Sequence, residues 1–304
     1  MIQEFKIRKI MTPTSLPLQD DNLMAWSEKL SNVFQAQLVL YNAVNPITED
    51  EHNMQATKSN QFLKSAMIGL VKLGKNIQSI YKIRYLVEVG NHWRNLIRQV
   101  QDEHAHLLIA DMPAIGARTP GQLTAVMYNC PCPILFVRKG NQPLIPGKIL
   151  VPVRLKEGLE LKLPAIIAWA KSCGATVCLS AFAPDASSPK DNLRLQYLLE
   201  KMANILKTAG VKVESETAHG HHFGTAMVQR ARLTGADLIA IAVEPTNYVA
   251  QLFTKMVGPY FLENSPVPLL SIPLIHTASK LSNAAQLVPV NTMPVAMPLH
   301  TSVN

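Results

Sequence analysis

The feature that most constrains the fold of this chain is an internal repeat. Two apolar strands punctuated by proline, residues 131–137 and 266–272, lie 135 positions apart. A second apolar strand precedes each of them, at residues 107–110 and 238–243. A repeat of this length indicates a duplicated domain, because the repeats of solenoid proteins are only ~20–50 residues long. The 304 residues therefore divide into two halves, each long enough to bury its own core.

Amphipathic helical patterns separate the apolar strands in both halves. Apolar residues recur at helical spacing, and glycine follows two of the patterns, as is typical of a helix end. The predicted helices lie around residues 23–30, 62–73, 93–100, 163–170 and 195–206. Strands that alternate with such helices form parallel sheets covered on both faces. Each half is therefore predicted to be an α/β domain with a doubly wound, open, parallel sheet.

Composition changes mark the predicted domain boundaries. Residues 1–140 form the first domain and residues 147–274 the second, joined by a turn-rich linker that contains glycine and proline. The segment that follows, residues 275–304, carries a single charged residue, Lys280, and shows no helical period. We expect it to be an extended or disordered tail.

Charge and cysteine content exclude several classes of protein. The formal net charge is +8, but basic residues are scattered and aromatic residues make up only 6% of the chain, so we expect no nucleic acid partner. No apolar stretch approaches the ~20 residues that a membrane span needs. The N-terminal residues alternate apolar and charged side chains and contain no export signal. Four cysteines without paired C-x-x-C spacing suggest reduced thiols in the cytoplasm.

Six segments carry a resemblance to a known family. They are KIMTPT (9–14), VEVG (87–90), NCPCPILFV (129–137), KILVPV (148–153), GADLIAI (235–241) and SPVPLLSI (265–272). In their order, spacing and repetition, over about residues 5–273, they resemble the universal stress protein family in its tandem, two-domain form. The resemblance implies two five-stranded, Rossmann-like sheets of the adenine nucleotide alpha hydrolase type, with strand order 3-2-1-4-5. It also implies pairing through the last strands, so residues 134–137 and 269–272 should lie antiparallel.

The family resemblance further implies a nucleotide site where the strand order reverses. Nucleotide-binding members place an Asp after strand one and a G-x2-G-x9-G-[S/T] loop after strand four, where backbone N–H groups approach the phosphates. In the second half, Arg154 replaces the Asp, and Pro245 and Tyr248 replace the first two glycines. Only Gly258 remains, and Pro259 follows it without an N–H to donate.

The first half departs from the nucleotide-binding pattern as well. Ser15 stands at the Asp position, and Asp111, which would repel phosphate, follows strand four. Gly116 and Gly121 do not keep the spacing. We therefore expect no cofactor, with ATP or another adenine nucleotide as the alternative.

The candidate binding residues lie at the predicted switch-point cleft of the second half: Val153, Arg154, His219, Gly220 and Gly258. Arg154 could hold an anionic ligand or pair with a nearby glutamate, Glu157 or Glu160. Three histidines, His219, His221 and His222, raise the alternative of a metal site, but no carboxylate or thiol at a useful spacing completes the set, and we predict none.

No catalytic residues are predicted, because no nucleophile elbow or Ser–His–Asp set is marked out. Cys130 and Cys132 flank Pro131 at the start of a buried strand, where core packing is the simpler interpretation and a redox pair the alternative. The favoured function is a stress-associated regulatory or ligand-sensing module with a degenerate nucleotide site. The alternatives are a weak ATP-binding or nucleotide-hydrolysing protein and a protein-interaction scaffold. An unidentified protein partner and a homodimer both remain open.

Overall fold

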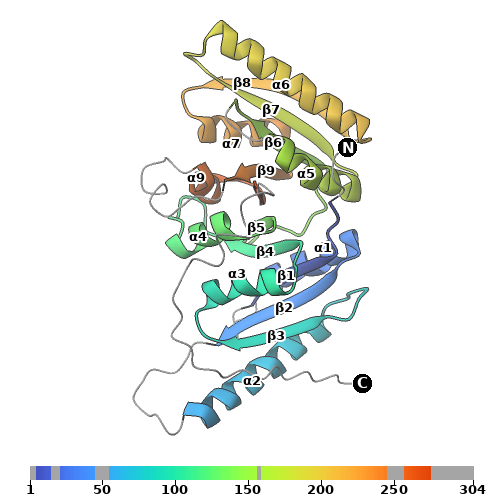
Figure 1. Ribbon diagram of the computed structural model, residues 1–304, viewed down its shortest axis with the longest axis vertical. Coiled ribbons are helices and arrows are strands. Elements are labelled where there is room, and N and C mark those ends of the chain that lie inside the picture. Colours follow the sequence, from blue (N-terminus) through green and yellow to red (C-terminus); the bar gives the residue numbers. More distant parts are fainter. Residues whose placement is uncertain (1–4, 15–20, 45–54, 156–158, 245–256, 275–304) are drawn as a thin grey trace. The chain divides into compact units, whose positions relative to one another are not determined.

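Helices and strands alternate through both halves of the chain (Figure 1). The computed structural model describes residues 5–14, 21–44, 55–155, 159–244 and 257–274. The first half comprises β1 (Lys9–Pro13), α1 (Asp21–Phe34), β2 (Gln37–Val44), α2 (Gln55–Lys75), β3 (Arg84–Val89), α3 (His92–Asp102), β4 (Leu107–Met112), α4 (Gly121–Asn129) and β5 (Ile134–Arg138). The second half comprises β6 (Lys148–Val153), α5 (Leu159–Cys173), β7 (Thr176–Pro184), α6 (Pro189–Thr208), β8 (Lys212–Gly220), α7 (Phe223–Thr234), β9 (Leu238–Val243), α9 (Val257–Asn264) and β10 (Leu269–Pro273). The predicted tail, residues 275–304, lies outside the described residues.

The strands form one ten-stranded sheet in the order β3-β2-β1-β4-β5-β10-β9-β6-β7-β8. Each half has the order 3-2-1-4-5 counted from its own first strand, so the predicted fold class is confirmed. Within each half the strands are parallel, whereas β5 and β10 run antiparallel with Leu135 opposite Leu270. The antiparallel contact of these two strands was predicted from the sequence. It hides two apolar strand edges that would otherwise invite association.

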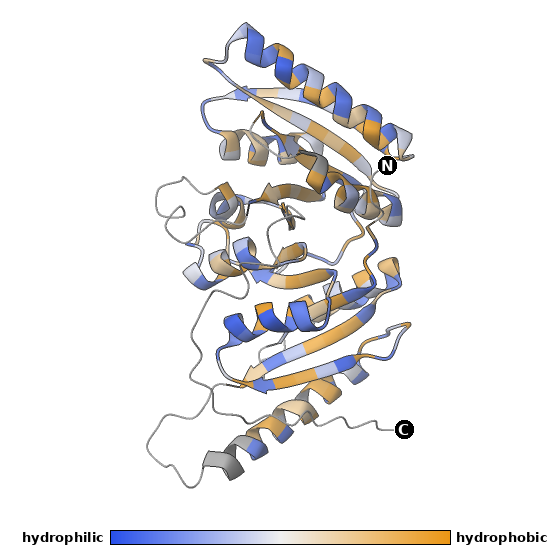
Figure 2. Cartoon of the chain, in the orientation of Figure 1, coloured by the Kyte–Doolittle hydropathy of each residue, from blue (hydrophilic) through white to orange (hydrophobic). Residues whose placement is uncertain are grey.

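The central strands are largely apolar because helices cover both of their faces. Strand β9 has the sequence LIAIAV, with five of its six residues buried, and β5 is buried throughout. Strand β8, at the edge of the sheet, instead has the polar sequence KVESETAHG, and only Ala218 in it is fully buried. Figure 2 shows the largely apolar β7 beside helix α6, on which polar and apolar residues alternate.

Two layers of apolar side chains pack against the sheet, one on each face. One layer is built from α1, α2, α5 and α6 and includes Leu30, Leu70, Trp169 and Leu199. The other is built from α3, α4, α7 and α9 and includes Leu96, Val126, Met227 and Phe261. Each layer contains residues from both halves, and the rings of Phe34 and Trp169 meet edge to face at 5.0 Å between centroids. The halves therefore share their hydrophobic cores.

Helix α2 corrects one prediction from the sequence. Ala66, Leu70 and Leu73 are buried, as their spacing predicts, but Phe62 is 49% exposed and does not belong to the apolar stripe. The first two turns of the helix therefore extend beyond the sheet that its later turns cover. Although α2 has 21 residues, its stripe is narrow, and no helix in the described parts of the chain is both long enough and apolar enough to span a bilayer.

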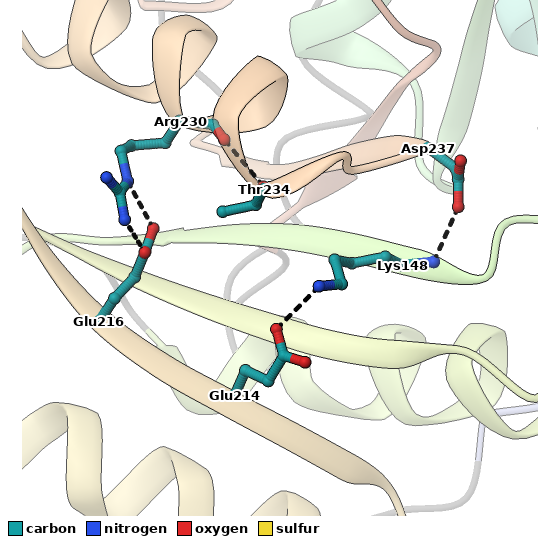
Figure 3. Close-up of polar contacts among 6 residues, drawn as sticks. All are labelled: Lys148, Glu214, Glu216, Arg230, Thr234 and Asp237. Carbon is teal, nitrogen blue, oxygen red and sulfur yellow. Dashed lines mark hydrogen bonds and ion pairs between the residues drawn. The ribbon is translucent and has the colours of Figure 1, made fainter.

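Polar contacts fix the start of β6 and the open edge of the sheet (Figure 3). The carboxylate of Asp237 accepts hydrogen bonds from the backbone N–H groups of Gly147 and Lys148, both at 2.9 Å. The side chain of Lys148 donates to Glu214 at 2.9 Å, and Arg230 pairs with Glu216. These contacts tie the polar strand β8 to its neighbours and leave its outer edge unpaired within the described sheet.

Candidate functional site

The switch point of each half lies where its first and fourth strands separate. Strands β6 and β9 pair only at Ile149 with Leu238 and at Leu150 with Ile239. Beyond these residues β6 continues to Val153 without a partner on that side, although it pairs with β7 along all six of its residues. Strands β1 and β4 separate in the same way after two pairs. Crevices of this kind bind ligands in open α/β sheets.

Arg154 follows β6 at the second of these switch points and lies on an aromatic surface. Its guanidinium carbon is 4.6 Å from the centroid of the Phe223 ring, a cation–π distance. Phe223 in turn meets Phe182 at 5.5 Å and Phe261 at 6.0 Å between ring centroids. Val153, the residue before Arg154, is fully buried. The Arg154 side chain therefore lies against a cluster of aromatic rings.

Gly258, at the start of α9, is in close contact with the first half of the chain. The Tyr128 hydroxyl, from α4, accepts a hydrogen bond from the backbone N–H of Gly258. Burial raises the pKa of Tyr128, while this N–H and the charge of Arg154 act in the opposite direction, so the hydroxyl remains neutral. A Cβ atom at Gly258 would lie 2.7 Å from the Met127 sulfur and 2.9 Å from the Tyr128 oxygen. A residue larger than glycine fits here only if the Met127 and Tyr128 side chains shift.

A matching contact reaches from the second half to the start of α4. Glu263, from α9, accepts a hydrogen bond from the backbone N–H of Thr119 at 2.8 Å. Its own carbonyl accepts one from the N–H of Gly116, also at 2.8 Å. A carboxylate is favourable at this place because the start of a helix carries a partial positive charge. The residue before α4, Pro120, provides no side-chain cap of its own.

The two contacts involve equivalent positions of the repeat. Tyr128 and Glu263 are 135 residues apart, the same spacing that separates Pro131 from Pro266. Helices α4 and α9 pack against each other, and each sends this side chain to the start of the other helix. The sequence analysis missed both residues. The signal that could have found them is the repeat offset itself, combined with the predicted antiparallel contact of β5 and β10.

At the first switch point, polar contacts join the end of β1 to β2. The side chain of Asn42 donates to the backbone carbonyl of Thr14 at 2.7 Å, and the Thr14 hydroxyl donates to the carbonyl of Tyr41 at 3.2 Å. Asp111 is exposed but lies within β4, opposite Val137, and not after strand four as the sequence predicted, because β4 continues for two residues beyond its apolar run. Ser15 lies outside the described residues.

The structure brings together some of the predicted binding residues and separates others. Arg154 and Gly258 both lie close to Tyr128. His219 instead lines a cavity of about 750 Å³ between α6 and the edge strand β8, whose walls include Leu199 and Thr217. Gly220 ends β8, two strands away from β6. Four residues that the sequence analysis names near this cleft also fall outside the described side chains: Glu157, Glu160, Pro245 and Tyr248.

Of the two histidines that follow β8, one contacts a carboxylate. His221 pairs through Nδ1 with Asp185 at 3.2 Å, and His222 precedes α7 without capping it. Among the described residues, no three His, Cys, Asp or Glu side chains come together in a way that could hold a metal ion.

Comparison with known proteins places the fold. No protein-family model matches the chain, and no curated protein matches it in sequence. A universal stress protein from Archaeoglobus fulgidus superposes with a TM-score of 0.64 at 14% identity, covering 89% of this chain and 98% of its own. A functionally unknown protein from Pseudomonas aeruginosa gives a TM-score of 0.58 at 17% identity, covering 88% and 93%. The chain thus has the fold of a universal stress protein of two halves, and the predicted resemblance is confirmed at the level of the fold.

Proposed function

We propose that this chain is a tandem universal stress protein that acts as a regulatory or ligand-sensing module without tight nucleotide binding. The observation that carries the proposal is the reciprocal contact of Tyr128 with Gly258 and of Glu263 with Thr119. Backbone N–H groups at a helix start are the groups that bind phosphate in folds of this kind. Here a side chain from the opposite half already accepts from one such group at each site.

The chemistry of the two occupying side chains opposes phosphate binding in different ways. The Glu263 carboxylate is negatively charged and would repel a phosphate at the start of α4. The Tyr128 hydroxyl is neutral, but the Met127 and Tyr128 side chains leave no room at Gly258 even for a methyl group. Pro259, next to Gly258, has no N–H to offer. The Arg154 guanidinium lies over the Phe223 ring in this cleft.

In this proposal the paired halves correspond to a dimer of single-domain proteins joined in one chain, with domains at residues 1–140 and 147–274. The shared cores and the β5–β10 pairing support that arrangement. The four cysteines are free thiols, which supports a reducing compartment such as the cytoplasm. The physiological ligand or partner would then act through the remaining surface rather than through a phosphate loop.

Calorimetry with two ligands tests the proposal. We expect Mg-ATP to bind with a dissociation constant weaker than ~100 μM, which corresponds to a free energy of binding of only about −5.5 kcal/mol. We also expect ATP to bind no more tightly than adenosine, because the phosphates gain no N–H donors. A low-micromolar constant for ATP, or a tenfold preference for ATP over adenosine, would contradict the proposal. The Glu263→Ala variant is the matched comparison, since it frees the Thr119 N–H and removes the repelling charge.

A further inference from the structure

Two cysteine thiols are in contact between α4 and β5. The sulfur atoms of Cys130 and Cys132 are 3.8 Å apart, and both residues are buried, with exposed fractions of 1% and 6%. Cys130 ends α4, where its N–H donates to the carbonyl of Val126. The chain on either side reaches the surface, since Asn129 is exposed and Pro131 is half-buried. The segment that carries the two sulfurs therefore reaches the surface between them and before them.

The contact with Cys130 and burial both raise the pKa of Cys132, so this thiol keeps its proton. Either sulfur can be the hydrogen-bond donor in this contact. A disulfide has a sulfur–sulfur distance of about 2.05 Å, so the two sulfurs need to approach by only ~1.8 Å. The two cysteines of the second half are placed differently, because Cys173 ends α5 and Cys178 lies inside β7.

We propose that Cys130 and Cys132 form a redox site that a hydroperoxide oxidises to an intramolecular disulfide. This inference goes beyond the proposed function and does not depend on it. One of the two sulfurs first attacks the peroxide; one oxygen is transferred to give a sulfenic acid, and the other leaves as an alcohol or water. The second sulfur then attacks the oxidised sulfur, the S–S bond forms, and the hydroxyl leaves with the proton of the attacking thiol as water. The two thiols lose two electrons and two protons in total, and the peroxide is reduced.

Burial and contact have opposite effects on the two steps. Burial makes the first step slow and restricts it to small peroxides, because a neutral, covered thiol is a weak nucleophile. Contact makes the second step fast, because the resolving thiol is already beside the sulfenic acid. The disulfide should therefore accumulate without a populated sulfenic or sulfinic acid.

The two cysteines lie between α4 and β5, which both contact the second half, so a disulfide here would form at the junction of the two halves. The disulfide would join the last turn of α4 to the segment that enters β5. Helix α4 carries Met127 and Tyr128, which contact Gly258, and β5 pairs with β10.

Peptide mapping of the full-length protein tests the inference and contains its own control. Trypsin releases residues 119–138, which hold Cys130 and Cys132, and residues 172–190, which hold Cys173 and Cys178. After hydrogen peroxide treatment and alkylation, we expect residues 119–138 to lose the mass of two hydrogen atoms and to take up no alkyl group. Residues 172–190 should carry two alkyl groups. Oxidation of Met127 adds the mass of one oxygen and is scored separately.

Serine variants test the two cysteines one at a time. In Cys132→Ser and in Cys130→Ser we expect a sulfenic acid at the remaining cysteine, which dimedone traps, and no disulfide within this peptide. The wild-type map alone can overturn the inference, so it stands or falls even if a variant does not fold. Both cysteines of residues 119–138 remaining open to alkylation after prolonged exposure would refute it, and so would their conversion to sulfinic acids or equal oxidation of the two peptides.

Discussion

Replacement of Gly258 by alanine tests whether this residue is retained for packing between the halves or for access by a ligand. The added Cβ would lie 2.7 Å from the Met127 sulfur and 2.9 Å from the Tyr128 oxygen, closer than unstrained contacts allow. Overpacking of a buried site costs about 1–3 kcal/mol. The free energy of unfolding of Gly258→Ala should therefore fall by that amount, as measured by urea denaturation followed by circular dichroism and tryptophan fluorescence.

Gly121→Ala is the matched control, because Gly121 begins α4 and a Cβ atom there meets nothing within 4 Å. It should leave stability unchanged or raise it by up to ~1 kcal/mol, since alanine restricts the unfolded chain and favours helix. A double-mutant cycle with Met127→Ala locates the source of the strain. Removal of the Met127 sulfur should reduce the cost of Gly258→Ala by about 1 kcal/mol, as expected for residues in contact. Equal effects of Gly258→Ala and Gly121→Ala, or no coupling to Met127, would refute this account of Gly258.

Three further predictions concern contacts elsewhere in the chain. Asp237→Ala leaves the N–H groups of Gly147 and Lys148 without their acceptor and should lower the free energy of unfolding by about 1–2 kcal/mol. Glu214→Gln, at an exposed ion pair, should change the free energy of unfolding by less than ~0.5 kcal/mol, and urea denaturation of both variants checks the difference. Glu263→Ala should destabilise the protein more than Glu263→Gln, because glutamine can still accept from the Thr119 N–H; equal melting temperatures would contradict it. Burial lowers the pKa of His92 and of His106, so below about pH 6.5 the unfolded chain binds more protons than the folded chain. The stability that is present above about pH 6.5 should therefore be lost as the pH falls toward and through the pKa values of the folded state. His92→Asn should flatten that decline between pH 7.5 and pH 5.5, and an unchanged slope would exclude His92 as a contributor.

The strand order and the junction of the halves could be predicted because the order, spacing and repetition of the apolar segments resemble those of a known family, which implies both. A continuous apolar run such as LIAIAV in β9 indicates a strand buried on both faces, and the repeat fixes which strands are equivalent. The exposure of Phe62 was not predictable, because helical spacing shows which side chains share a stripe but not how far along the helix the sheet extends. The position of His219 in the cavity between α6 and β8 was missed for a related reason. Strand β8 is an edge strand, so its residues that line this cavity are not held in the core.

The reciprocal contacts could not be derived from either half alone. Tyr128 belongs to no recognisable motif in α4, and Glu263 has the pattern of an ordinary surface acid in the short helix α9. Their partners become visible only when β5 and β10 are set side by side, since that contact brings α4 against α9. Local sequence patterns carry no information on which helix start a side chain from another domain will reach.

Joining two domains in one chain permits a difference that a symmetric dimer does not. In a two-fold dimer of identical chains, the side chain that reaches the partner's helix start is the same on both sides. Here the equivalent positions are a neutral tyrosine and an acidic glutamate, and the surroundings of each differ accordingly. The Tyr128 hydroxyl lies in a buried site near the charged Arg154. Because the hydroxyl is neutral, it accepts from the Gly258 N–H without the cost of burying a carboxylate there. The Glu263 carboxylate lies at the less enclosed start of α4, where its charge complements the helix. Since each helix start is matched to a different side chain, a ligand that entered one cleft would meet different chemistry in the other, and the two halves need not share a ligand.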